Sequence, residues 1–129
     1  MMDPKNLRFA ETHEWVRLDG DVATIGISKF AVEQLTDLVF VDLPAPGRSV
    51  AAGEPFGEIE SVKAVSDLFA PVGGTVLEVN TVVKADATAI GTDPYGSGWL
   101  IKLRVDPGTN LDHLLTHDQY LKQIAEEQH

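Results

Sequence analysis

Lys63 is the residue of this sequence whose type and position are best suited to chemistry. It lies in the segment EIESVKAVSD, residues 58–67, where small or β-branched residues surround it and acids lie on both sides. This pattern predicts strands at 56–62 and 65–69, with Lys63-Ala64 in the turn between them. A lysine at the tip of a stiff hairpin presents a projecting amine, which becomes a good nucleophile once it is deprotonated. The position is suited to covalent modification of Lys63, but most lysines in turns are only solvated charges, and the local setting alone favours that interpretation.

The histidines suggest two further kinds of chemistry, and we expect the protein to use neither. His13 and Glu14 could form an acid–base pair. Neighbours on a strand point to opposite faces, however, so we interpret both as solvent-facing residues at the start of a strand. His113 and His117 have the i, i+4 spacing of a helical metal site, but no third ligand accompanies them. We therefore expect no catalytic residues, no metal site and no independent enzymatic activity.

Composition restricts the possible cofactors and partners. The chain has no cysteine, so it can have neither disulfides nor thiolate ligands, and any thiol chemistry must come from an attached group. A formal net charge of −10 disfavours binding to nucleic acid or to anionic membranes and favours partners with basic docking surfaces. No apolar run is long enough to span a membrane, and the first residues have no apolar core of a secretory signal. We expect a monomer in the cytoplasm, or in the mitochondrial matrix if a presequence has been removed.

The elements that must position Lys63 are mostly short strands. The length of 129 residues predicts a single domain over 1–129, with a helical extension at about 109–127. Turns rich in proline and glycine separate the predicted strands, which lie at 14–18, 22–27, 38–43, 56–62, 65–69, 75–79 and 99–105. The first two are expected to pair as a hairpin. This pattern predicts a mainly β protein, either a sandwich or a flattened barrel.

Two helices are predicted among these strands. Ser28 is a suitable N-cap for a helix at 29–35. Thr116 and Gln119 form a capping box that begins a C-terminal helix, whose apolar stripe is expected to pack across the sheets. Residues 80–94 show weak periodicity and are interpreted as an ordered loop.

Five motifs in order resemble the glycine cleavage system H-protein family. They are THEWV at 12–16, VATIGIS at 22–28, LVFVDLP at 38–44, ESVKA at 60–64 and PYGSGWL at 94–100. The resemblance runs from about Leu7 to Ile124, which is nearly the whole chain. It implies a lipoyl-domain-like fold, the barrel-sandwich hybrid. Such a fold has a pair of antiparallel sheets, a short helix after the first hairpin and a C-terminal helix.

The resemblance also implies a cofactor and the residues around it. In this family the lysine that matches Lys63 carries lipoate in amide linkage. The neighbours of that lysine in the lipoylation motif correspond here to Glu60, Ser61, Val62 and Ala64. Glu14 is a candidate for contact with the lipoyl arm.

The function implied by the resemblance is that of a carrier protein. The lipoyl-lysine of the family shuttles the aminomethyl group of glycine from a pyridoxal-phosphate-dependent decarboxylase (P-protein) to a tetrahydrofolate-dependent aminomethyltransferase (T-protein). Dihydrolipoamide dehydrogenase (L-protein) then reoxidises the arm, which a lipoyl or octanoyl transferase or a lipoate ligase attaches. A chain without cysteine fits this role, because no internal thiol competes for the disulfide of the arm.

One segment departs from the family pattern. The family commonly has a Pro-x-Leu-Val-Asn segment where this chain has ATAIG at 87–91, and only the apolar character of Ile90 is retained. Because this loop lies near the sheltered arm in the family, the substitution is expected to affect shelter of the arm, or docking to one partner, more than lipoylation.

Two alternatives remain open, and a third is disfavoured. A lipoyl-relay protein, which donates lipoate to 2-oxo-acid dehydrogenase complexes, would need Lys63 as well, so the sequence does not separate it from the carrier. An interaction module without any modification is the alternative from another class. A biotin carrier is disfavoured, because such proteins usually place methionine on both sides of the lysine, where this chain has Val62 and Ala64.

Overall fold

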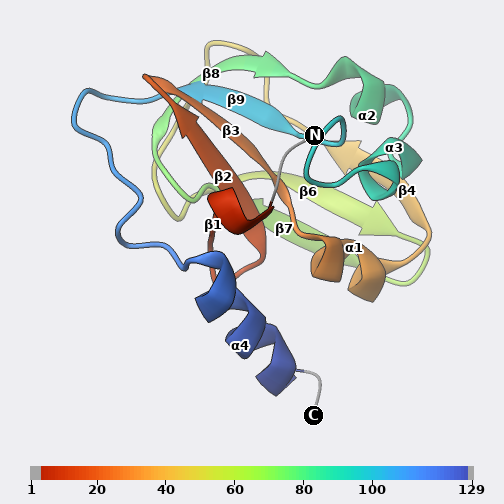
Figure 1. Ribbon diagram of the computed structural model, residues 1–129. Coiled ribbons are helices and arrows are strands. Elements are labelled where there is room, and N and C mark those ends of the chain that lie inside the picture. The colour runs from red at the N-terminus through yellow and green to blue at the C-terminus, as the bar shows by residue number, and fades with distance from the viewer. Residues whose placement is uncertain (1–3, 128–129) are drawn as a thin grey trace.

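The computed structural model describes residues 4–127, which form two antiparallel β-sheets with short helices at their edges (Figure 1). The elements in chain order are η1 (Pro4–Asn6), β1 (Arg8–Phe9), β2 (Glu14–Asp19), β3 (Val22–Ile27), α1 (Lys29–Leu35), β4 (Leu38–Asp42), β5 (Ser49–Val50), β6 (Pro55–Ser61), β7 (Val65–Phe69), β8 (Gly74–Val79), α2 (Thr81–Ala85), α3 (Thr88–Thr92), β9 (Ile101–Arg104) and α4 (His117–Glu127). The larger sheet has the order β1-β2-β3-β9-β8-β5, and the smaller has the order β4-β6-β7. This architecture confirms the predicted mainly β, lipoyl-domain-like class.

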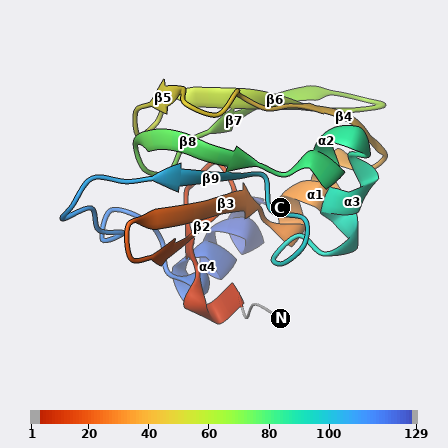
Figure 2. The same ribbon diagram turned by 90° about the horizontal axis from the view of Figure 1, so that it is seen from above.

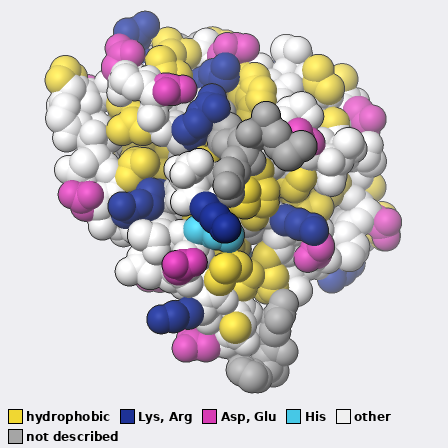
Figure 3. Space-filling model, viewed as in Figure 1, with side chains coloured by type: hydrophobic (Ala, Val, Ile, Leu, Met, Phe, Trp, Pro, Cys, Tyr) yellow, Lys and Arg dark blue, Asp and Glu magenta, His cyan; other side chains and the backbone are white. Residues whose placement is uncertain are grey.

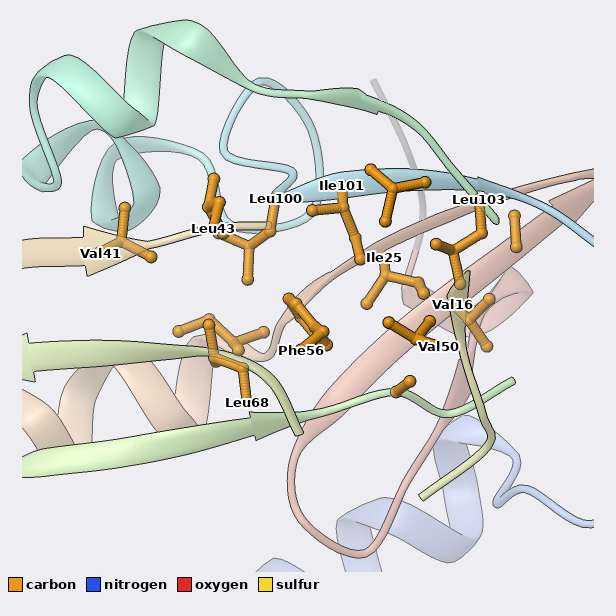
Figure 4. Close-up of a cluster of buried hydrophobic side chains, with 14 of the residues drawn as sticks. Val16, Ile25, Val41, Leu43, Val50, Phe56, Leu68, Leu100, Ile101 and Leu103 are labelled. Atoms are coloured by element: carbon orange, nitrogen blue, oxygen red, sulfur yellow. The ribbon is translucent and has the colours of Figure 1, made fainter. Parts of the chain in front are cut away.

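The two sheets form separate layers, and the main core lies between them (Figure 2). Alternating residues of both sheets point into this space, so Val16 and Ile25 from the large sheet meet Phe56 and Leu68 from the small one (Figure 4). Each of these four side chains is at most 2% exposed. Burial of such apolar side chains contributes roughly 1.5–3 kcal/mol apiece, so the layer of contact fixes the small sheet firmly on the large one.

The hairpin and the helix predicted near the N-terminus are both present. Strands β2 and β3 pair from Glu14↔Ile27 to Asp19↔Val22, and Gly20 turns the chain with a φ of +61°. The side chain of Ser28 then accepts a hydrogen bond from the backbone N–H of Ala31, which caps α1 as expected. Helix α1 is thus fixed directly after the strand that precedes it.

The C-terminal helix contacts fewer elements than predicted. The capping box is confirmed, because Thr116 N–H donates to the Gln119 side chain and Gln119 N–H donates to the Thr116 hydroxyl. Helix α4 lies against η1 and β1 rather than across both sheets (Figure 1). Tyr120 stacks on Phe9 with ring centroids 4.4 Å apart, whereas Leu121 of the predicted stripe remains 44% exposed. The helix therefore belongs to a second apolar cluster, formed by Leu7, Phe9, Trp15 and Tyr120.

The prediction of an ordered loop at 80–94 was wrong, because the segment contains α2 and α3. Each of these helices has only five residues, too few to show a helical period in the sequence. Asn80 caps α2 through Val82 N–H, and its amide also donates to the carbonyl of Trp99 at 2.7 Å. Tertiary contacts of this kind, together with the buried side chains of Val83 and Ile90, determine the two helices.

The remaining differences lie at strand boundaries. The two-residue strands β1 and β5 were not predicted, since they exist only through pairing with β2 and β8. The last strand begins at Ile101, not at Trp99, because Trp99 N–H donates to Gly96 in a turn. Among residues 4–127, no helix is long and apolar enough to cross a membrane.

Candidate functional site

Lys63 lies at the tip of the hairpin formed by β6 and β7. The last pair of the ladder is Glu60↔Val65, and Ser61 N–H donates to the carbonyl of Ala64 at 2.8 Å to close the turn. Lys63 is exposed and, within residues 4–127, has no hydrogen bond or ion pair. Its amine is therefore free to enter the active site of another protein.

The turn beneath Lys63 is held from two directions. The Ser61 side chain, only 4% exposed, accepts from Ala64 N–H at 3.1 Å and donates to the carbonyl of Ala64 at 3.3 Å. On the other side, Val62 N–H donates to the carbonyl of Asp37 at 3.1 Å, from the segment that joins α1 to β4. Because both flanks of the turn are tied, Lys63 projects from a stiff backbone.

The outer surface next to the tip is apolar and acidic. Phe40 of β4, Glu60 of β6 and Val65 of β7 lie in register across the small sheet, and all three side chains are exposed. Val62, in the turn itself, is 75% exposed. The motif neighbours Glu60, Val62 and Ala64 therefore lie on the surface around Lys63, whereas Ser61 points inward.

A pocket of about 290 Å³ opens between the start of β2, helix α1 and strand β7. Its lining residues are Thr12, His13, Glu14, Ile27, Phe30, Ala31, Gln34, Leu35, Ile59, Ser66, Asp67, Leu68 and Glu127. Ser66 and Ile59 are three and four residues from Lys63 along the hairpin, which corresponds to about 10 and 13 Å of strand. The lysine and the pocket are thus connected by a single hairpin.

Glu14 is buried in this pocket, which corrects the expectation that it faces solvent. Its side chain is 1% exposed. One carboxylate oxygen accepts from Phe69 N–H at 2.9 Å, and the other accepts from the hydroxyl of Thr12. Burial raises the pKa of Glu14 from its ordinary value of 4.5 to about 7, although these hydrogen bonds oppose the rise.

His13 shares the pocket with Glu14, although neighbours on a strand were expected to point to opposite faces. The two residues do not both lie on a strand, because β2 begins at Glu14, and His13 has a φ of +84°. The left-handed backbone turns the two side chains toward the same pocket. The imidazole Nδ1 is 2.7 Å from the hydroxyl of Tyr120, and Nε2 is 3.1 Å from a carboxylate oxygen of Glu127.

His113 and His117, the other histidines within residues 4–127, are not brought together as metal ligands. His113 precedes α4, so it does not share a helix with His117, and its Nε2 lies 2.8 Å from the carbonyl of Pro71. His117 packs on the ring of Phe9. Among the described residues, no group of three potential ligands could hold a metal ion.

The divergent segment 87–91 does not line the pocket. Its helix α3 packs on α1, where Gly91 lies close to Val32, and Ile90 is fully buried in the main core. Any influence of this segment on the pocket must therefore be indirect, through α1 or through the main core.

These features define a class of protein, namely small lipoyl-domain-like β proteins with a lysine displayed on a hairpin. The family model of the glycine cleavage H-protein matches residues 7–127. The chain therefore belongs to the glycine cleavage H-protein family.

Individual relatives agree with this assignment. The chain is 56% identical to a glycine cleavage system H protein of Gloeothece citriformis, over 96% of this chain and 95% of the relative. It is 50% identical to a protein of the same description from Rubrobacter xylanophilus, over 97% of each chain. The crystal structure of a glycine cleavage system H protein from Mycobacterium marinum superposes with a TM-score of 0.87 and 43% identity, over 95% of this chain and 99% of that one.

Proposed function

We propose that the protein is the lipoyl carrier of a glycine cleavage system and that lipoate is attached to the Nζ atom of Lys63. The observation that carries this proposal is the exposed amine of Lys63 on a turn fixed by Ser61 and by the carbonyl of Asp37. An attaching enzyme must deprotonate the amine and bring it to an activated carboxyl group, so it needs a lysine that projects while its backbone stays in place. The protein is then a substrate for its partners and not an enzyme itself.

The residues below the hairpin fit a lipoyl arm. Ile27, Phe30, Leu35, Ile59 and Leu68 give the pocket the apolar walls that a hydrocarbon chain and a dithiolane ring require. When attached, the lipoyl group supplies a disulfide that can open to carry a one-carbon amine and can be restored by oxidation.

Glu14 is proposed to bind the amine that the arm carries. Its carboxylate lies in a pocket with apolar walls, where a cation is attracted more strongly than in water. With a pKa of about 7, Glu14 is ionised above neutrality and can pair with an ammonium group there. The apolar walls exclude water from the same space, which protects a labile carbon–nitrogen linkage from hydrolysis.

The partners are proposed to dock on the small sheet. All the charged residues of β4, β6 and β7 are acids, namely Asp42, Glu58, Glu60 and Asp67. In contrast, the large sheet carries Arg8, Arg17, Lys102 and Arg104, and its face shows basic side chains interspersed with acids (Figure 3). The decarboxylase, the aminomethyltransferase, dihydrolipoamide dehydrogenase and the transferase or ligase that attaches lipoate should each present cations around the entry of the arm. The relatives named above are bacterial, and we propose a bacterial cytoplasm as the location.

Reconstitution tests the proposed function. The chain is lipoylated with a lipoate ligase and mixed with the other three proteins of a glycine cleavage system, and the exchange of labelled bicarbonate into glycine is measured. We expect exchange with the wild-type chain and with Lys84→Arg, whose lysine lies exposed on α2, but none with Lys63→Arg. Absence of exchange with the fully lipoylated wild-type chain, under conditions in which a known carrier is active, would overturn the proposal.

A further inference from the structure

One hydroxyl group connects two walls of the pocket. The hydroxyl of Tyr120 on α4 lies 2.7 Å from Nδ1 of His13 and 2.5 Å from Oγ of Ser28. His13 precedes Glu14 at the floor of the pocket, whereas Ser28 caps α1, which supplies Phe30 and other wall residues. A residue of the C-terminal helix thus links the side chains of two segments that β2 and β3 separate in the sequence.

The donors and acceptors of these groups form one continuous chain. Ser28 Oγ accepts from Ala31 N–H, so its own proton can be donated to the oxygen of Tyr120. Tyr120 can then donate to Nδ1 of His13, and His13 can donate from Nε2 to the carboxylate of Glu127 at 3.1 Å. Every polar atom of the chain is satisfied in this order, and such networks specify one arrangement of the groups that they join.

Helix α4 reaches the pocket at a second point. Glu127 lines the pocket directly, and its other oxygen accepts from the amide of Gln123 at 2.7 Å. That amide also donates to the carbonyl of Glu11 at 2.9 Å. The segment before His13 is therefore tied to α4 on the same side as the imidazole.

The backbone of His13 is held by two hydrogen bonds of its own, since its N–H donates to the carbonyl of Ala10 and its carbonyl accepts from Ser28 N–H, each at 2.9 Å. Its φ of +84° lies in the left-handed region, where a residue with a side chain costs about 1–3 kcal/mol and persists only if its surroundings hold it. The stacking of Tyr120 on Phe9 anchors the helix separately from the hydroxyl. Removal of the hydroxyl alone should therefore release the imidazole of His13 and leave α4 and the backbone of His13 in place.

We propose that Tyr120 is a positioning residue for the pocket: its hydroxyl fixes the imidazole of His13 beside the N-cap of α1, and so sets the shape of the space beside Glu14. This inference rests on the proposed function, in which the pocket shelters the load of the lipoyl arm. The C-terminal helix thereby contributes to carrier function although it contains no residue that is modified.

The first test uses the protein without lipoate. Tyr120→Phe removes the hydroxyl and keeps the ring on Phe9, and Lys122→Ala is a matched change at an exposed position of α4. Amide resonances of Tyr120→Phe should shift at residues 12–14 and 28–35, while circular dichroism stays that of the folded protein. Shifts in α4 alone, or no shifts beyond those of Lys122→Ala, would contradict the proposal.

The second test uses the lipoylated protein after it has been loaded with the one-carbon amine. The rate at which ammonia is released from the loaded protein into buffer should rise about fivefold in Tyr120→Phe, which is the effect expected from the loss of one hydrogen bond. The rate for Lys122→Ala should not change. Glu14→Gln is measured in parallel and should release ammonia faster than the wild type.

Glu14→Gln distinguishes the role of Tyr120 from the shelter of the load by the pocket. If Glu14→Gln accelerates release and Tyr120→Phe does not, the role of Tyr120 is refuted and the shelter remains. If neither variant changes the rate, the pocket does not shelter the load, and the proposed use of Glu14 fails together with the inference built on it.

Discussion

At the scale of single residues, the site depends on two side chains in opposite environments. Lys63 is exposed and without a partner among the described residues, whereas Glu14 is buried and doubly hydrogen bonded. An exposed lysine can reach the active site of an attaching enzyme, and a buried carboxylate can bind one cation selectively. The proposed carrier needs both properties.

The burial of Glu14 predicts how its replacement changes stability with pH. Because the folded state raises the pKa of Glu14 from 4.5 to about 7, it holds the proton more tightly than the unfolded chain does. The stability contributed by this group is therefore complete below pH 4.5 and is lost as pH rises toward 7. The rise in pKa corresponds to about 3 kcal/mol as an upper limit.

Glu14→Gln removes this titration. Its free energy of unfolding, relative to that of the wild type, should increase between acidic and mildly alkaline pH, with the change completed near neutrality. Urea denaturation at several pH values measures the difference. A difference that is independent of pH would show that Glu14 titrates as an ordinary surface carboxylate.

Residue patterns predicted the hairpin turn that holds Lys63, but they did not predict the burial of Glu14. A lysine in a hairpin turn can be recognised from local sequence, because the turn and its flanking strands are local. Burial of Glu14 could not be recognised in this way, since it depends on Phe69 and on β2 starting one residue after His13. The one available signal was the alternation of β2, in which Glu14 shares a face with the core residue Val16.

At the scale of elements, the hairpin of β6 and β7 is the critical unit. Ser61 ties its turn by two contacts with Ala64, and it is buried although it is polar. Those contacts replace the ladder that ends at Glu60↔Val65. The position of Lys63 thus depends on this hydroxyl group together with the hydrogen bond from Val62 N–H to the carbonyl of Asp37.

Ser61→Ala is therefore expected to loosen the turn. The loss of this hydroxyl should destabilise the protein by about 1 kcal/mol and lower the initial rate of lipoylation several-fold. Ser49→Ala, an exposed serine of β5, is the matched control and should change neither quantity. Thermal unfolding and the rate of lipoyl incorporation are the two measurements, and an unchanged rate in Ser61→Ala would mean that the ligase does not need a fixed turn.

The accuracy of the predicted elements follows their length and their regularity. Strands β2, β3 and β7 and helix α1 were predicted within one residue, because each has a clear period and a turn or a cap beside it. Helices α2 and α3 were missed, since Asn80 and contacts with the core determine them. The predicted capping box located the start of α4, but nothing local indicated that Tyr120 reaches His13.

At the scale of the whole molecule, the two sheets differ in charge, because the strands of the small sheet carry only acids and those of the large sheet carry both acids and bases. Asp42, Glu58 and Asp67 lie in register across β4, β6 and β7, where like charges destabilise a sheet. The row adjoins the apolar residues next to Lys63. This arrangement suits brief docking to a surface with an apolar centre and a basic rim.

Glu58→Gln tests this view of docking. The variant should be slightly more stable than the wild type, and it should associate about twofold more slowly with the aminomethyltransferase at low salt, because one steering charge is lost. The difference should disappear at high salt. Glu78→Gln, on the exposed face of the large sheet, is the control, and stopped-flow association rates are the measurement. An equal effect of both variants would mean that only net charge matters.

Lys63 is proposed to carry the lipoyl arm, and intact-mass spectrometry shows whether it does. The chain is incubated with lipoate, ATP and a lipoate ligase, and its mass is compared with those of Lys63→Arg and Lys84→Arg treated in the same way. We predict a gain of one lipoyl group in the wild type and in Lys84→Arg, and no gain in Lys63→Arg. A lipoyl gain in Lys63→Arg, or no gain in the wild-type chain, would contradict the account.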